Sequence, residues 1–215
     1  NAKRFKGGNS FAGFLNNIRK EALAHTPDAE RASLSFLNEE LTTSAPAELP
    51  RPKGPGRIWT TEDVAKLVTD KGLEGRDLTN GQAMFRAGLC ANCHRFKGEG
   101  GIGGPDLTGS GGRFSPSDLA DAILNPNNVI SDQYHNSLLS MIDGSEQLGR
   151  VLGEEDGHLL VMPTSMAPDH ILRIPKAKVK ATTPSKISPM MPGLVNAMNP
   201  DEVLDLLAYL RSGVN

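Results

Sequence analysis

Two cysteines and a histidine stand together in the segment GLCANCHRFKGEGG, and they are the side chains of this chain best suited to chemistry. Cys90 and Cys93 are one helical turn apart, His94 follows at once, and the 215-residue sequence has no other cysteine. Two thiols at this spacing could form a redox-active dithiol, a disulfide, half of a zinc site or the attachment points of a haem. The residues around them have to decide among these possibilities.

Three of these possibilities ask for something that the sequence does not supply. A thioredoxin-like dithiol follows a strand in a βαβ unit, and no strand pattern precedes Gly88. A structural zinc ion takes four ligands, and the remaining histidines, at positions 25, 135, 158 and 170, are not spaced as a pair. A disulfide across so short a loop would be strained.

The C-x-x-C-H spacing uses all three residues when the bound group is haem. The thiols add across the two vinyl groups, and the imidazole of the next residue can coordinate the iron. The glycine-rich segment GIGGPDL lets the chain turn tightly against a flat ligand, because glycine permits close approach. In that turn the carbonyl of Pro105 could accept the other ring N–H of His94 and fix its tautomer. We therefore predict one covalently attached haem c, bound by Cys90, Cys93 and His94.

Two longer stretches extend this pattern: MFRAGLCANCHRFKGEGGIGGPDLTGSGGRFSPSDLADAILNPNNVISDQY and, near the end, SPMMPGLVNAMNPDEVLDLLAYL. Together they resemble the planctomycete-type haem-binding domain, a branch of the monohaem class I cytochromes c. The resemblance covers residues 75–215 and is faint over residues 1–60. It implies a fold in which the last helix crosses the helix before the haem, with a histidine and a methionine as iron ligands. Such domains are often fused to dehydrogenases, β-propellers, helical repeats or copper domains, which implies a redox partner protein or a fused dehydrogenase domain.

A methionine near the C-terminus is the expected sixth ligand, since a soft thioether suits an electron-transfer haem. Met190 and Met191 lie in the proline-bounded loop SPMMPG before the last predicted helix. The family pattern Ser-x-Met-Pro-x-Gly-Leu, counted from Ser188 to Gly193, implies Met190. The sequence departs from this pattern, because Met191 occupies the proline position and Pro192 follows it. If the Met-Pro dipeptide matters more than the register, Met191 is the alternative ligand. The methionines at 162 and 166 fall in or beside predicted strands, where this residue ordinarily fills gaps.

The whole chain divides into three predicted regions. Residues 1–45 contain two short amphipathic helical patterns and look like the tail of an upstream domain. Residues 46–57 form a proline-rich linker, and residues 58–215 form the cytochrome c domain. Helices are expected at residues 59–72, 78–94, 115–126 and 199–213, where capping residues precede apolar residues at helical spacing.

Between residues 136 and 183, short apolar runs separated by turn signals predict four or five strands. The expected fold is therefore mainly α, a cytochrome c fold with a small antiparallel β-sheet inserted before the methionine loop. We expect this insertion to act as a lid over the haem edge. Trp59, Arg113 and Tyr134 are candidate donors to the haem propionates.

Composition narrows the function further. The net charge of −2 argues against a nucleic-acid partner, and no apolar run approaches the roughly 20 residues that span a bilayer. With two protein ligands the iron has no open position, so we predict an electron carrier without catalytic residues. Because haem c is attached outside the cytoplasm, we expect a periplasmic or otherwise exported protein. The alternatives are a haem enzyme or sensor, such as a peroxidase or gas binder with a labile methionine, and an interaction module with a structural haem. Because the sequence begins with Asn1, we expect a processed or excised form.

Overall fold

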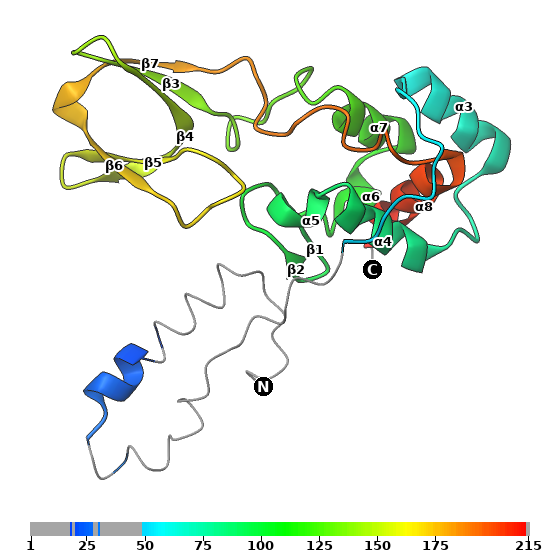
Figure 1. The fold of residues 1–215 in the computed structure, drawn as a ribbon, viewed down its shortest axis with the longest axis horizontal. Helices are drawn as coiled ribbons and strands as arrows, with labels where there is room; N and C mark the ends of the chain where they lie inside the picture. The colour runs from blue at the N-terminus through cyan, green and yellow to red at the C-terminus, as the bar shows by residue number, and fades with distance from the viewer. Residues whose placement is uncertain (1–17, 19, 28–29, 31–48, 214–215) are drawn as a thin grey trace. The chain divides into compact units, whose positions relative to one another are not determined.

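The computed structural model describes residues 18, 20–27, 30 and 49–213 of the chain. The chain divides into two units, residues 1–49 and residues 50–215, which are drawn in Figure 1. In the first unit residues 18, 20–25 and 30 are helical, and most of the two helical patterns expected in residues 1–45 lies outside the described residues. Within the described part of the chain, no helix is long and apolar enough to cross a membrane.

The longer helices of the second unit begin at the capping residues that the sequence displays. Ser115 accepts a hydrogen bond from the backbone N–H of Asp118, and the carboxylate of Asp118 accepts one from the backbone N–H of Ser115. Asn199 and Glu202 form the same capping box. These reciprocal bonds satisfy backbone groups that a helix end would leave without partners. The helices are α3 (Thr61–Lys71), α4 (Leu78–Ala87), α5 (Cys90–Cys93), α6 (Ser110–Arg113), α7 (Pro116–Leu124) and α8 (Pro200–Arg211).

The last helix, α8, lies at the centre of the helical part and crosses α4. At the crossing, a Cβ on Gly81 would overlap the carbonyl oxygen of Asp205 and lie 2.6 Å from Cβ of Tyr209. Tyr209 also stacks against Phe85 and Phe96, with ring centroids 5.9 and 4.6 Å away. The two helices therefore meet backbone to backbone, beside an aromatic cluster, as expected for the last helix and the helix before the haem.

Five antiparallel strands form a sheet between α7 and α8, in the order β6-β5-β4-β3-β7. The predicted inserted sheet is therefore confirmed. Leu139 and Val161 are fully buried and give the sheet its own small core. The strands are β3 (Ser137–Met141), β4 (Glu146–Glu155), β5 (His158–Met162), β6 (Leu172–Pro175) and β7 (Val179–Pro184).

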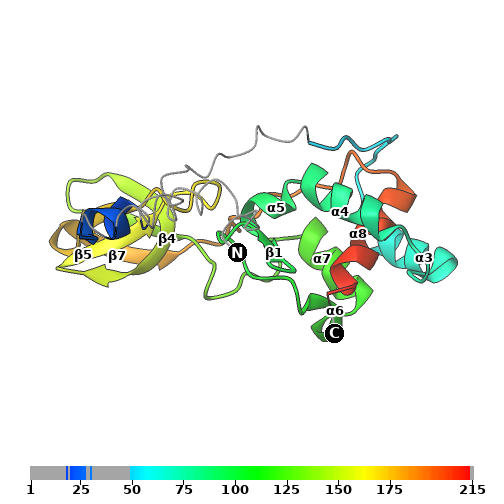
Figure 2. The same cartoon turned by 90° about the horizontal axis from the view of Figure 1, so that it is seen from below.

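The inserted sheet leaves the helical part and returns to it at one place. Ser137 of β3 pairs with Pro184 of β7, and the N–H of Ser185 donates to the carbonyl of Asn136 at 2.7 Å. The long strand β4 passes from its partner β3 to its partner β5, with a bulge between Val151 and Gly153. Figure 2 shows the strands of this inserted sheet gathered apart from helices α3 to α8. A mainly α description therefore fits the helical part alone, because the described residues divide between helices and strands.

Candidate haem-attachment site

The two cysteines occupy the first and last positions of the one-turn helix α5. We expected one helix over residues 78–94, but α4 ends at Ala87 and Leu89 adopts a left-handed conformation with φ of 59° before α5 begins. Both thiols are free, with Cys90 buried and Cys93 half-buried. Burial raises the pKa of both thiols, that of Cys90 to about 11, so the Cys90 thiol is protonated at neutral pH.

His94 ends the same turn and is held by the loop that follows. Its Nδ1 lies 2.9 Å from the carbonyl oxygen of Pro105, the contact expected from the sequence. Since a carbonyl only accepts, Nδ1 carries the proton and Nε2 keeps the lone pair that a metal requires. Burial lowers the pKa of His94, although the Pro105 bond opposes that shift. The ring is therefore presented as a neutral imidazole with one nitrogen free to coordinate iron.

A glycine-rich loop wraps closely around this turn. The N–H of Gly101 donates to the carbonyl of Ala91 at 2.9 Å, and the N–H of Gly104 donates to that of Cys93 at 2.7 Å. A Cβ on Gly104 would lie 2.8 Å from Cε1 and 2.9 Å from Nδ1 of His94. The loop can approach the imidazole this closely only because position 104 has no side chain.

Residues 78–145 match the family model of cytochrome c. This segment of the chain is therefore similar to cytochrome c. The match begins with α4, includes the cysteines, His94 and the glycine-rich loop, and ends just beyond β3. Such a domain carries covalently bound haem c and serves electron transfer in general. None of the curated proteins matches the chain.

The side chains around the C-x-x-C-H motif do not form a binding site for a bare metal ion. Among residues 49–213 and the few described before them, no three His, Cys, Asp or Glu side chains gather as a metal site. The donor set at the motif, two free thiols beside a single imidazole, fits covalent haem attachment instead.

Arg95 follows His94 directly and adds a second indication of the haem. Its Nε is buried and has no hydrogen-bond partner. An unpartnered buried donor destabilises a fold by about 1–3 kcal/mol, so a carboxylate of the haem is a fitting acceptor for it. The sequence reasoning missed Arg95, because an arginine after the motif gives no sign of what its Nε contacts.

The three side chains expected to donate to the haem propionates each contact another group of the protein. Trp59 is buried and uses its single N–H on the carbonyl of Met198, at 3.2 Å. Arg113 donates through Nε to the carbonyl of Gly109, and Tyr134 lies under the guanidinium of Arg150, 5.0 Å from ring centroid to Cζ. Trp59 therefore has no donor left for a haem carboxylate.

The inserted sheet reaches the cytochrome c motif through the loop between β5 and β6. The Cys93 sulfur lies 3.7 Å from the carbonyl oxygen of Ser165 and 3.7 Å from the sulfur of Met166. Nη1 of Arg150, on β4, donates to the carbonyl of Gly103 at 3.0 Å. Met166 is 51% exposed, so it does not fill a gap in a core as its position beside the strands suggested. No periodic pattern in the sequence reveals these contacts.

Hydrogen bonds hold the methionine loop on the N-terminal side of Met190 and Met191. The N–H of Ser188 donates to Oδ1 of Asn127 at 2.8 Å, and the N–H of Met190 donates to Oγ of Ser188 at 3.1 Å. Met190 is half-buried, whereas Met191 is 52% exposed. Gly193 follows with φ of 81°, a conformation that favours glycine.

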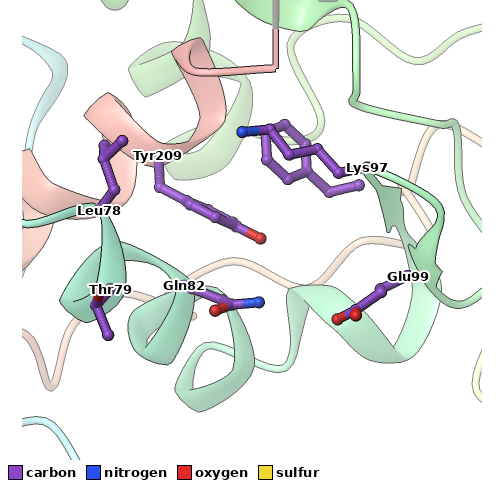
Figure 3. A pocket seen from close by; sticks show the side chains of 7 residues that line it. Leu78, Thr79, Gln82, Lys97, Glu99 and Tyr209 are labelled. Carbon is purple, nitrogen blue, oxygen red and sulfur yellow. The ribbon is translucent and has the colours of Figure 1, made fainter. Parts of the chain in front are cut away.

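A separate pocket of about 370 Å³ opens at the crossing of α4 and α8 (Figure 3). The Tyr209 side chain points into it, and Lys97 and Glu99 lie on its rim with opposite charges. Neither cysteine nor His94 lines this pocket, so it is not the haem site. Its residues are Leu78, Thr79, Gln82, Phe96, Lys97, Glu99 and Tyr209.

Proposed function

We propose that this chain is a monohaem electron carrier of the planctomycete type, with His94 and Met190 as the axial ligands of a single haem c. The observation that carries the proposal is the 2.9 Å contact between Nδ1 of His94 and the carbonyl of Pro105, which leaves Nε2 free. When bound, the haem supplies a one-electron couple between ferric and ferrous iron.

The residues around the haem have separate tasks. Cys90 and Cys93 retain the group by thioether bonds, so it is not lost when the protein is diluted or exported. Pro105 holds the proton on Nδ1 of His94 and raises the basicity of the ligand, as outer hydrogen-bond partners of metal-bound histidines do. Together these groups bind and orient the cofactor without offering a catalytic acid or base.

Met190 is favoured over Met191 by its setting. It is half-buried and follows directly on a segment anchored through Ser188, whereas 52% of Met191 is exposed. With His94 on one side of the iron only one further position is left, so both sulfurs cannot bind at once. The buried Met84, Met162 and Met198 serve as packing residues, each with 2% or less of its surface exposed.

The test is the absorption spectrum of two single variants. Met190→Ala should abolish the methionine–iron band of the ferric protein and lower its reduction potential, because a thioether stabilises ferrous iron. Met191→Ala should leave both nearly unchanged. The reverse result would assign the ligand to Met191, and a high-spin ferric spectrum of the unaltered protein would favour a peroxidase or gas sensor over a carrier.

The cellular setting of this carrier is also part of the proposal. Attachment of haem c takes place outside the cytoplasm, which supports a periplasmic or otherwise exported protein. The fusion partners of related domains favour residues 1–45 as the tail of an upstream domain, such as a dehydrogenase or another redox partner. Expression with and without an export signal tests the first point, since only the exported form should acquire covalent haem.

A further inference from the structure

Residues 50–59, which we name the strap, lie across the start of α8. The N–H of Lys53 donates to Oε1 of Glu202 at 2.6 Å, and the N–H of Asn199 donates to Oε2 of the same carboxylate at 2.9 Å. Glu202 is only 2% exposed. One buried carboxylate thus joins the strap to the last residue before α8. A capping box needs only the second of these bonds, so the bond to Lys53 is additional.

Two further hydrogen bonds join the strap to residues 193–199, the segment that leads into α8. Nδ2 of Asn199 donates to the carbonyl of Gly54 at 3.3 Å, and Nε1 of Trp59 donates to the carbonyl of Met198 at 3.2 Å. Met198 is fully buried and Trp59 nearly so. The strap is therefore fixed near both of its ends.

Between these bonds the strap touches the segment backbone to backbone. A Cβ on Gly56 would overlap the backbone of Asn196 and Ala197. No rotation of a side chain could relieve that overlap, because the atoms concerned belong to the main chain. Glycine at position 56 is therefore required by close approach, although a proline-rich linker would not call for it.

The contacted segment follows directly on the methionine loop and is built of consecutive turns. The N–H of Asn196 donates to the carbonyl of Gly193 at 3.0 Å, and the N–H of Met198 donates to that of Val195 at 3.0 Å. Val195 and Met198 are buried in the helical core. These turns restrict the path of the backbone. A shift of this segment should therefore also move Met190, which lies three residues before Gly193.

We propose that the strap, held by Glu202, positions the methionine loop and so determines how firmly Met190 binds the iron. The inference rests on the proposed His94 and Met190 ligation. Glu202 acts through the loop and does not touch the haem, so it is a positioning residue. A residue with a purely structural role would change the stability of the whole fold without weakening the iron–sulfur bond selectively.

The test follows two signals of the ferric holoprotein during denaturant unfolding, the methionine–iron band and the far-UV circular dichroism of the helices. In Glu202→Gln the band should disappear well before the helical signal. The equilibrium constant for losing the methionine should rise about tenfold, the change that one lost buried hydrogen bond ordinarily produces. Hydrogen exchange at the Lys53 amide should accelerate by a similar factor.

Asp201→Asn is the matched control, because Asp201 lies in the same first turn of α8 but pairs with Lys71 and Arg76 on the surface. Gly56→Ala repeats the test from the strap without altering Glu202. Its control is Gly153→Ala, where an added Cβ meets nothing within 4 Å. The Gly56 variant should lose the band early, and both controls should not.

The outcomes separate this inference from the proposed function. If the unaltered protein shows no methionine–iron band, the His/Met ligation is wrong and the inference falls with it. If the band is present but is lost together with the helical signal in both Glu202→Gln and Gly56→Ala, the strap is merely structural and only the inference is overturned. Should Glu202→Gln fail to fold, Gly56→Ala decides alone.

Discussion

Gly104 is the residue whose size decides how closely the glycine-rich loop can hold the imidazole of His94. Its backbone lies against the ring of His94, and its N–H donates to the carbonyl of Cys93, so it contacts the last two residues of the C-x-x-C-H motif. Pro105 next to it accepts the imidazole N–H. Asp106 then closes the turn by accepting two hydrogen bonds from Thr108, at 2.8 and 2.6 Å.

Gly104→Ala should therefore destabilise the holoprotein by about 1–3 kcal/mol, the usual effect of overpacking, and should shift its reduction potential because the imidazole is displaced. Denaturant unfolding and redox titration measure the two effects. Gly109→Ala is the control, since a Cβ there would have its nearest neighbour, Nε of Arg113, at 3.9 Å. An unchanged potential in Gly104→Ala would show that the loop does not position His94.

Asp106 should make the stability depend on acid pH. Its hydrogen bonds with Thr108 lower its pKa below the ordinary value of 3.8, so the folded protein favours the charged form. This stabilisation is present above pH 3.8 and is lost as the pH falls through the lower pKa of the folded state. Asp106→Asn should thus be less stable than the unaltered protein at pH 7, by unfolding free energy, and the difference should shrink in acid. A difference that grows in acid would contradict this.

At the scale of elements, the crossing of α4 and α8 orients the helix that leads into the motif. Gly81 permits the contact, and the rings of Phe85, Phe96 and Tyr209 fill the space beside it. Phe96 comes from the short hairpin of β1 (Arg95–Phe96) and β2 (Glu99–Gly100), directly after His94. The crossing therefore holds the motif from both sides.

Gly81→Ala should destabilise the fold by about 1–3 kcal/mol by overlap with α8, although alanine favours a helix over glycine by about 1 kcal/mol. Thermal unfolding of the holoprotein measures the change. Thr79→Ala, at an exposed position on the same helix, should change the stability little. A stabilised Gly81→Ala would mean that the helices separate without cost.

At the scale of the whole second unit, the inserted sheet covers the Cys93 side of the motif. Its ends meet at the hydrogen bond between Asn136 and Ser185, and its β5–β6 loop returns to Cys93. The sheet has its own buried residues in Leu139 and Val161. These observations support a lid that forms separately from the helical core.

Replacing residues 137–184 by two glycines should leave a folded holoprotein, because the two ends are already adjacent and a short closure costs little entropy. Reduction by a small reagent such as hexaammineruthenium should become several-fold faster, since the Cys93 edge is uncovered. Stopped-flow absorbance measures the rate. Met166→Ala alone should give a smaller increase, and equal rates in all three proteins would exclude a lid.

The sequence by itself determined the features that depend on neighbours along the chain. The thiol spacing and the histidine after it predicted the attachment motif, because a haem needs these groups within one turn. Capping residues such as Ser115 and Asn199 predicted where helices begin, and short apolar runs separated by turn signals predicted four or five strands where the inserted sheet has five. Each of these signals is local, because it depends only on residues close together along the chain.

Only the tertiary structure decided the features that join distant segments. The left-handed Leu89 interrupts a pattern that reads as one helix, Arg150 reaches Gly103 from the inserted sheet, and Glu202 accepts from Lys53 across the fold. None of these contacts has a sequence period, because the partners are brought together by packing and not by spacing. A proline-rich stretch reads as a linker until the carboxylate that holds it is located, and that location depends on where α8 lies.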